Sequence, residues 1–270
     1  MPSKPIIAIT MGDPAGIGPE IILKALADPI VKRVSRPLIL GDWGVLQRAR
    51  SGKRDMPRLV CWKQGQQLLS LLDDPKTYAV CSLSSLTPKE SRPGVSSKAG
   101  GRSVYSYIRV AAKLALSKVA DAVATAPISK SNLIEAGYNY PGHTELLAEL
   151  SGAEQCRIML IGAKLRVVPV TGHIRFTEVA RSLKPENIQT TLELTQRALQ
   201  NFFRIKRPRI AVAALNPHGG EEGIFGDEEI KIIAPAVKAA RHKGFSVHGP
   251  LPADSLFHHA ARGDYDAVVC

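Results

Sequence analysis

The sequence has few aromatic residues and no long hydrophobic run, and each scarcity argues against a class of protein. Phe, Trp and Tyr make up 5% of the 270 residues, which is poor for stacking nucleic acid bases. No apolar segment approaches the roughly 20 residues that a membrane helix requires. The short apolar stretch after Lys4 is broken by Gly12-Asp13-Pro14 before the core of a signal peptide could form. We therefore expect a cytoplasmic protein without a membrane segment.

Acidic residues are outnumbered by basic ones, 24 against 36, and the formal net charge is +12. Such an excess attracts anions, from nucleic acids to small phosphorylated molecules. The basic residues are scattered, and the densest run, Arg204–Arg209, has no aromatic neighbours except Phe202 and Phe203. A small anionic substrate fits the charge equally well. We therefore expect no nucleic acid partner, and nucleic acid binding is an alternative that rests on net charge alone.

Cysteine is also scarce, with four residues at positions 61, 81, 156 and 270. No two have the CxxC spacing of a redox or metal motif, and a disulfide framework is not expected. Cys81 and Cys156 lie among apolar residues. We predict reduced and mostly buried thiols.

The sequence is rich in apolar, β-branched runs that alternate with amphipathic segments of helical period. This alternation is typical of an α/β fold with a mainly parallel sheet. Strands are expected at Ile6–Thr10, Pro37–Leu40, Arg58–Trp62, Tyr78–Cys81, Asp121–Thr125, Arg157–Ile161, Arg166–Val170, Arg209–Ala214 and Asp266–Cys270. Helices are expected at Gly18–Ala27, Ala99–Val119, Glu145–Leu150, Pro185–Phe203, Asp227–Lys243 and Ser255–Ala261. Ligands of such folds bind beyond the carboxyl ends of the strands.

Two segments leave the organisation of the chain open. The loop Ser82–Gly101, rich in Ser, Lys, Pro and Gly, either joins two subdomains or is a surface loop. The segment Asp264–Cys270 has the pattern of a buried strand, and nothing follows it. We expect that strand to leave a sheet face uncovered unless a further segment or a partner subunit covers it.

A glycine-rich turn, Met11–Glu20 (MGDPAGIGPE), follows the first expected strand. Such a turn between a strand and a helix often holds a phosphate or a nucleotide. Its glycines at positions 12, 16 and 18 do not match GxGxxG, and no Gly-Lys-Ser/Thr of a P-loop follows. The turn alone therefore identifies no ligand.

Two polar clusters carry residues that can bind an anion. In Pro141–Glu145, Thr144 is expected to cap the following helix, and His143 can donate to a phosphate or carboxylate at that helix N-terminus. A capping turn with a chance histidine explains the pattern equally well. In Ala124–Lys130, Lys130 either meets a phosphate or is a surface lysine.

Three further residues indicate a metal site. His173 and His218 each follow a strand of what we expect to be the same sheet, and histidine is a common ligand of catalytic divalent ions. A structural role in hydrogen bonding is the alternative for each. Asp254 stands where a helix begins, so it either caps that helix or orients a ligand or metal. The remaining histidines, 242, 248, 258 and 259, have the pattern of solvated residues.

Six segments together resemble the 4-hydroxythreonine-4-phosphate dehydrogenase family, which is related in fold to the isocitrate and isopropylmalate dehydrogenases. They occur in the family's order: Gly12–Glu20, Ala124–Lys130, Pro141–Glu145, Thr171–His173, Leu215–Gly223 and Gly249–Phe257. The resemblance implies that residues 1–270 form one family domain of two subdomains, with an active-site cleft between them and a subdomain boundary that stays open. The glycine-rich turn then shapes one wall of that cleft.

The resemblance also implies roles for the site residues. His143 and Thr144 match the substrate-binding pair, to which Lys130 is added as a candidate phosphate ligand. His173 and His218 match two of three ligands of a divalent metal (Zn, Mg or Co), and Asp254 is the candidate catalytic carboxylate. The family oxidises a phosphorylated hydroxy acid with NAD, and the keto acid then loses carbon dioxide. It acts as a homodimer with the metal site at the subunit interface. No NAD-binding residue is identified.

One departure from the family pattern concerns the third metal ligand. It lies in a Tyr-His-Asp-Gln-Gly motif after the strand that here reaches Cys270, so the family pattern is C-terminally incomplete in this sequence. We therefore expect the 270-residue chain to bind metal weakly and to turn over slowly. The expected substrate is 4-phosphohydroxy-L-threonine, in pyridoxal phosphate synthesis. The alternatives are 4-phospho-D-threonate or 4-phospho-D-erythronate as substrate, and an inactive remnant.

Overall fold

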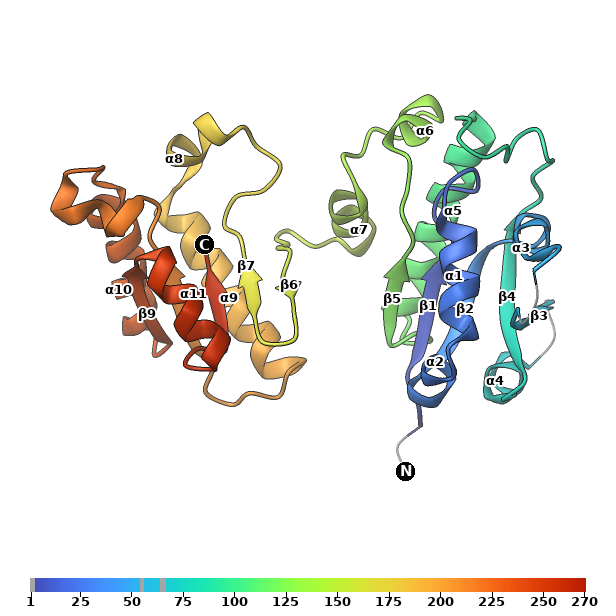
Figure 1. The fold of residues 1–270 in the computed structure, drawn as a ribbon, viewed down its shortest axis with the longest axis horizontal. Helices are drawn as coiled ribbons and strands as arrows, with labels where there is room; N and C mark the ends of the chain where they lie inside the picture. Colours follow the sequence, from blue (N-terminus) through green and yellow to red (C-terminus); the bar gives the residue numbers. More distant parts are fainter. Residues whose placement is uncertain (1–2, 54–55, 64–66) are drawn as a thin grey trace. The chain divides into compact units, whose positions relative to one another are not determined.

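The computed structural model describes residues 3–53, 56–63 and 67–270 (Figure 1). The chain divides into two compact units, Met1–Glu154 and Gln155–Cys270. Each unit contains a five-stranded sheet of its own. The predicted loop Ser82–Gly101 lies wholly within the first unit, so the interpretation that it joins two subdomains is wrong. Its first residues belong to the strand Thr77–Ser84 and its last to the helix Lys98–Leu116.

The sheet of the first unit is parallel throughout, in the order β3-β4-β2-β1-β5. Its strands are β1 (Ile6–Thr10), β2 (Arg36–Asp42), β3 (Arg58–Cys61), β4 (Thr77–Ser84) and β5 (Ala122–Thr125). Its helices are α1 (Gly18–Ala27), α2 (Pro29–Val34), α3 (Trp43–Arg50), α4 (Leu68–Asp73), α5 (Lys98–Leu116), α6 (Lys130–Glu135) and α7 (His143–Ser151). All five strands were expected from the sequence, with ends that shift by up to three residues.

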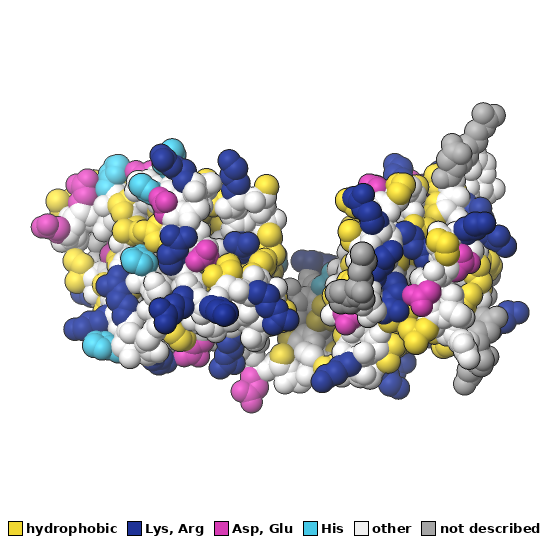
Figure 2. Space-filling view, turned by 90° about the horizontal axis from the view of Figure 1, so that it is seen from below, with side chains coloured by type: hydrophobic (Ala, Val, Ile, Leu, Met, Phe, Trp, Pro, Cys, Tyr) yellow, Lys and Arg dark blue, Asp and Glu magenta, His cyan; other side chains and the backbone are white. Residues whose placement is uncertain are grey.

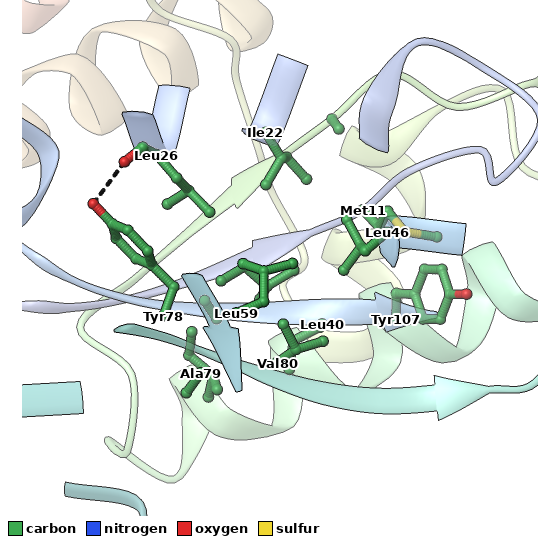
Figure 3. Packing of buried hydrophobic residues seen from close by; sticks show 14 of the residues in the cluster. Met11, Ile22, Leu26, Leu40, Leu46, Leu59, Tyr78, Ala79, Val80 and Tyr107 are labelled. Atoms are coloured by element: carbon green, nitrogen blue, oxygen red, sulfur yellow. Dashed lines mark hydrogen bonds between the residues drawn. The ribbon is translucent and has the colours of Figure 1, made fainter. Parts of the chain in front are cut away.

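The core of the first unit lies between the sheet and its helices, with α1 and α5 on opposite faces (Figure 1). Leu40 and Val80 from neighbouring strands are fully buried. Helix α1 contributes Ile22 and Leu26. The hydroxyl of Tyr78 donates to the carbonyl oxygen of Leu26 at 2.7 Å, which joins β4 to the end of that helix (Figure 3).

The glycine-rich turn is packed backbone to backbone against the segment after β5. The amide of Asp13 donates to the carbonyl of Pro127 at 3.0 Å. A Cβ on Gly12, whose φ is +71°, would lie 2.3 Å from that carbonyl oxygen, and a Cβ on Gly18 would lie 2.0 Å from the carbonyl oxygen of Met11. These glycines are required because the backbones approach so closely.

The sheet of the second unit has the order β6-β7-β10-β8-β9, with β6 antiparallel and the others parallel. Its strands are β6 (Leu160–Ile161), β7 (Arg166–Val168), β8 (Arg209–Ala213), β9 (Ser246–Leu251) and β10 (Ala267–Val269). Its α-helices are α8 (Val179–Ser182), α9 (Pro185–Asn201), α10 (Ala234–His242) and α11 (Ala253–Arg262). Two 3-10 helices, Phe176–Glu178 and Pro217–Gly223, and a π-helix, Glu229–Ile233, complete the unit.

The expectation that the last strand leaves a sheet face uncovered is wrong. β10 is the central strand, paired with β7 on one side and β8 on the other. Ala267 and Val269 belong to the apolar cluster with α9 and α10, while Val268 faces the opposite cluster with α11. Alternate side chains of one strand thus meet helices on both faces, which is why the run is apolar without interruption.

Other differences from the sequence predictions have local causes. Strand β9 was not expected because Gly249 and Pro250 interrupt it, and both residues are rare within strands. The predicted strand Arg157–Ile161 shrinks to its last two residues. Cys156 and Cys270 are exposed, so the prediction of mostly buried thiols is wrong for these two, while Cys61 and Cys81 are partly buried.

The basic side chains are scattered over the surface that Figure 2 shows. On the face drawn in Figure 2, Lys and Arg side chains are spread over each unit among acidic and apolar ones. Among the described residues, no helix combines the length and the apolarity that crossing a lipid bilayer requires.

The contact between α5 and α6 gives a test of the first unit. A Cβ on Gly101 would lie 1.9 Å from the carbonyl oxygen of Asn132 and 2.7 Å from Cβ of Ala136. We expect Gly101→Ala to lower the free energy of unfolding by about 1–3 kcal/mol, the usual cost of overpacking. The measurement is thermal unfolding followed by circular dichroism. Gly162→Ala is the control, because nothing lies within 4 Å of its Cβ, and equal midpoints for both variants would contradict the packing.

Candidate active site

The first unit carries the three expected substrate-binding residues on neighbouring helices. Lys130 is exposed and begins α6, which follows β5. His143 and Thr144 are half-buried and open α7. Both helices pack on α5 through one apolar cluster that contains Leu133 and Leu146. The fold thus holds the two helix N-termini on a common support.

The prediction that Thr144 caps α7 is wrong. The helix begins two residues earlier than predicted, at His143 rather than Glu145, and its N-cap is Gly142, which makes no side-chain hydrogen bond. The extended backbone of Gly142, with φ −178° and ψ −166°, ends the preceding turn there and places His143 in the first helical position. The imidazole therefore lies at the positive end of the helix dipole.

His143 has an unusual environment for a polar side chain. Its Nε2 atom is buried and has no hydrogen-bond partner among the described residues. Burial lowers the pKa of the imidazole below its ordinary value. A buried ring nitrogen without a partner is costly unless something binds it. The atom is therefore available to form a hydrogen bond with a ligand.

The turn before His143 is held by aromatic contacts. The rings of Tyr105 and Tyr138 are stacked, with centroids 3.9 Å apart. The hydroxyl of Tyr140 donates to Oε1 of Glu149 at 2.8 Å, and this hydrogen bond ties the turn to α7. These contacts fix where α7 begins and hence where the imidazole of His143 lies.

The second unit carries the expected metal ligands beyond the carboxyl ends of its strands. His173 follows β7 and His218 follows β8, and β10 lies between these strands in the same sheet. Both histidines are exposed and have positive φ, +56° and +53°. The prediction that they lie at matching strand ends of one sheet is confirmed.

Asp254 lies beside His218. Its Oδ2 atom is 3.7 Å from Nδ1 of His218, and both side chains are more than 60% exposed. Helix α11 is capped by Pro252 rather than by Asp254, so the capping interpretation of this aspartate is wrong. Its Oδ1 atom instead accepts from the amide of Ser255 at 2.7 Å. The carboxylate is free to orient the imidazole or to contact a bound cation.

The donor types suit a divalent ion, since imidazole nitrogen and carboxylate oxygen are common ligands of zinc and related ions. Within the described residues, however, no group of three His, Cys, Asp or Glu side chains is placed to hold a metal. The structure brings His218 and Asp254 together, and His173 stands on a separate loop. The third metal histidine that the resemblance implies stays a prediction.

Two further features of this region were not expected from the sequence. A cavity of about 220 Å³ opens at the carboxyl ends of β7, β8 and β10, lined mainly by apolar groups and reaching Thr171 and Leu215. The buried carboxylate of Glu229 holds the segment that carries His218. Two adjacent glutamates usually lie on the surface, and the sequence gives no sign that Glu229 is buried.

Comparison with known proteins decides the family. A family model described as pyridoxal phosphate biosynthetic protein PdxA matches residues 33–270. The chain belongs to the PdxA family. It is 48% identical over 273 residues to a 4-hydroxythreonine-4-phosphate dehydrogenase of Geobacter metallireducens, a match that covers 99% of this chain and 78% of that relative. The family predicted from the six segments is confirmed.

Other members of the PdxA family differ in the substrate that their names give. A D-threonate 4-phosphate dehydrogenase of Cupriavidus necator is 41% identical, over 98% of this chain and 78% of the relative. A crystal structure of 4-hydroxythreonine-4-phosphate dehydrogenase from Klebsiella pneumoniae is 39% identical with a TM-score of 0.87, over 99% of this chain and 80% of that one. The α/β architecture is therefore that of PdxA structures.

Burial of His143 predicts a pH dependence of stability. Because its pKa is lowered in the folded state and ordinary in the unfolded state, the unfolded chain binds more protons below about pH 6.5. This contribution to stability is complete above that pH and is lost as the pH falls toward the folded pKa. We expect the free energy of unfolding of His143→Gln to fall less than that of the wild type as the pH is lowered.

The measurement is urea unfolding at pH 7.5 and pH 5.5. The wild type should lose more stability over this interval than His143→Gln does. His242→Gln, at an exposed position at the end of α10, should keep the wild-type loss. An identical pH dependence in the wild type and His143→Gln would contradict the burial of this ring.

Proposed function

We propose that the chain is an NAD-dependent dehydrogenase that oxidises the secondary alcohol of a phosphorylated hydroxy acid, after which the keto acid loses carbon dioxide. The buried, unpartnered Nε2 of His143 at the N-terminus of α7 is the observation that carries this proposal. It supports a substrate that bears a phosphate or carboxylate. The relatives named above are dehydrogenases of phosphorylated C4 compounds, which supports the same class of substrate.

The first unit supplies groups that attract and orient the anionic end of the substrate. Nε2 of His143 forms a hydrogen bond with the phosphate or the carboxylate, and the amides of the first turn of α7 add a positive end. The hydroxyl of Thr144 lies beside it in the same turn. The exposed ammonium group of Lys130 adds a charge that pairs with phosphate.

In the second unit, His173, His218 and Asp254 are the residues that would hold a divalent ion. Such an ion, whether Zn, Mg or Co, supplies Lewis-acid polarisation of the reacting oxygen when it is bound. NAD supplies the hydride acceptor. The carboxylate of Asp254, whose Oδ2 lies 3.7 Å from Nδ1 of His218, would either bind the ion or orient that imidazole once the ion is bound.

The expected substrate is 4-phosphohydroxy-L-threonine, in pyridoxal phosphate synthesis, because the most similar relative described above carries that activity in its name. 4-Phospho-D-threonate is the second candidate, favoured by the name of the Cupriavidus relative, and 4-phospho-D-erythronate is a third. A homodimer and an isocitrate-dehydrogenase-like fold stay predictions. A nucleic acid-binding protein is the remaining alternative.

The proposal is tested by following NADH formation with each of the three substrates in the presence of Mg²⁺, Zn²⁺ or Co²⁺. We expect one substrate to be preferred. His218→Gln should lower kcat/KM by more than about 100-fold, because metal ligands contribute more than their supporting groups. His258→Gln, at an exposed position of α11, is the control and should retain wild-type activity.

Substrate binding is measured beside activity by titration calorimetry. His143→Gln should weaken binding by about 10- to 100-fold, the usual cost of losing a hydrogen bond to a charged group. Absence of both binding and turnover in the wild type would contradict the proposed function. Retention of DNA at physiological salt would favour the nucleic acid-binding alternative.

A further inference from the structure

We propose that Glu229 is a positioning residue that fixes the segment Leu215–Gly220 and thereby sets where His218 lies relative to Asp254. The proposal rests on the proposed function, since it treats His218 as a metal ligand. Glu229 itself does not touch the metal in this proposal. Its role is carried by hydrogen bonds to the chain just before His218.

The carboxylate of Glu229 is buried, with 4% of the residue exposed. Its Oε1 atom accepts from the amides of Leu215 and Asn216, both at 2.7 Å. Its Oε2 atom accepts from Nδ2 of Asn216 at 2.9 Å. Burial raises the pKa of Glu229, but the hydrogen bonds from Asn216 and Leu215 outweigh burial and leave the pKa below its ordinary value. The carboxylate is therefore ionised and fully engaged at neutral pH.

The segment that Glu229 holds has a backbone that needs external support. The segment His218–Gly223 is a run of six residues with positive φ, from +42° to +102°. Residues other than glycine rarely adopt this conformation, and it persists only where the surroundings determine it. Leu215 and Asn216, three and two residues before His218, donate three hydrogen bonds to the one buried carboxylate, and these bonds provide such a determinant.

The carboxylate of Glu229, which we call the clamp together with its hydrogen bonds from Leu215 and Asn216, packs close to the candidate metal residues. A Cβ on Gly220 would lie 2.8 Å from Oε2 of Glu229, so the backbone passes directly over the carboxylate. A Cβ on Gly219 would lie 3.6 Å from Cγ of Pro252, which precedes α11. Asp254 stands in the first turn of that helix and faces His218. The carboxylate of Glu229 therefore lies against the loop on one side of the His218–Asp254 pair, and Pro252 lies near the loop at the start of α11.

The first unit offers a matched control for the clamp. Asp42 is also a buried carboxylate, with 1% of the residue exposed. It accepts from the amides of Val45 and Leu86 and from the hydroxyl of Ser84, at 2.8–2.9 Å. The described structure gives it no contact with the candidate metal residues. Asp42→Asn and Glu229→Gln thus remove the same chemistry, one far from His218 in sequence and one beside its loop.

The experiment compares hydrogen exchange and Co²⁺ binding of the full 270-residue chain for wild type, Glu229→Gln and Asp42→Asn. We expect Glu229→Gln to speed exchange of the amides in 215–220 by at least about tenfold, because their opening is no longer opposed by the carboxylate. It should also weaken Co²⁺ binding by about 10- to 100-fold and change the visible absorption of the bound ion. Asp42→Asn should lower the melting temperature and leave both readouts of the second unit at wild-type values.

Asn216→Ala provides a second variant in case Glu229→Gln does not fold, because it removes one of the three hydrogen bonds to Glu229, together with the hydrogen bond from Nδ2 to Oε2 of Glu228 at 2.7 Å. It should change both readouts in the same direction. Wild-type exchange in 215–220 of these variants would overturn the proposal, as would faster exchange with unchanged Co²⁺ affinity and spectrum. If the wild type binds no Co²⁺, the metal part of the proposed function fails, and unchanged exchange in Glu229→Gln would separately show that no clamp exists.

Discussion

A buried carboxylate that accepts hydrogen bonds from backbone amides is the interaction on which the loops of both units depend. Asp42 ends β2, caps α3 through Val45 and receives the amide of Leu86 after β4. Glu229 accepts hydrogen bonds from the amides of Leu215 and Asn216 in the segment after β8. A charge removed from water is stable only when its partners are fixed. Each carboxylate thus converts a flexible connection at the carboxyl edge of its sheet into a defined one.

The sequence predicts the parts of this protein that follow from local periodicity. The strands of the first sheet, the long helices and the placement of His173 and His218 beyond strand ends all follow from apolar runs and the residues that end them. The position of β10 does not, because a run of three apolar residues does not reveal which strands it pairs with. Its central place depends on apolar contacts with α9 and α10 on one face and with α11 on the other.

The candidate site is predictable in its residue types and less so in its geometry. The motif around His143 identifies the residue, but the start of α7 depends on the extended backbone of Gly142 and on the packing of Tyr138. Burial of the ring nitrogen arises from that tertiary arrangement and has no signature in the motif. Conversely, Asp254 and His218 are exposed, so their pairing depends on a loop whose support comes from Glu229, a residue that no motif distinguishes.

The order of strands in the second unit has a consequence for how the chain is made. All five strands of the first unit have been synthesised by Thr125, and their sheet can pair while the rest is still being translated. In the second unit, β7 and β8 are neighbours only through β10, which is the last of its strands in the sequence. Until Ala267–Val269 leave the ribosome, these two strands have open edges and apolar faces. The second unit is therefore more exposed to aggregation during synthesis than the first.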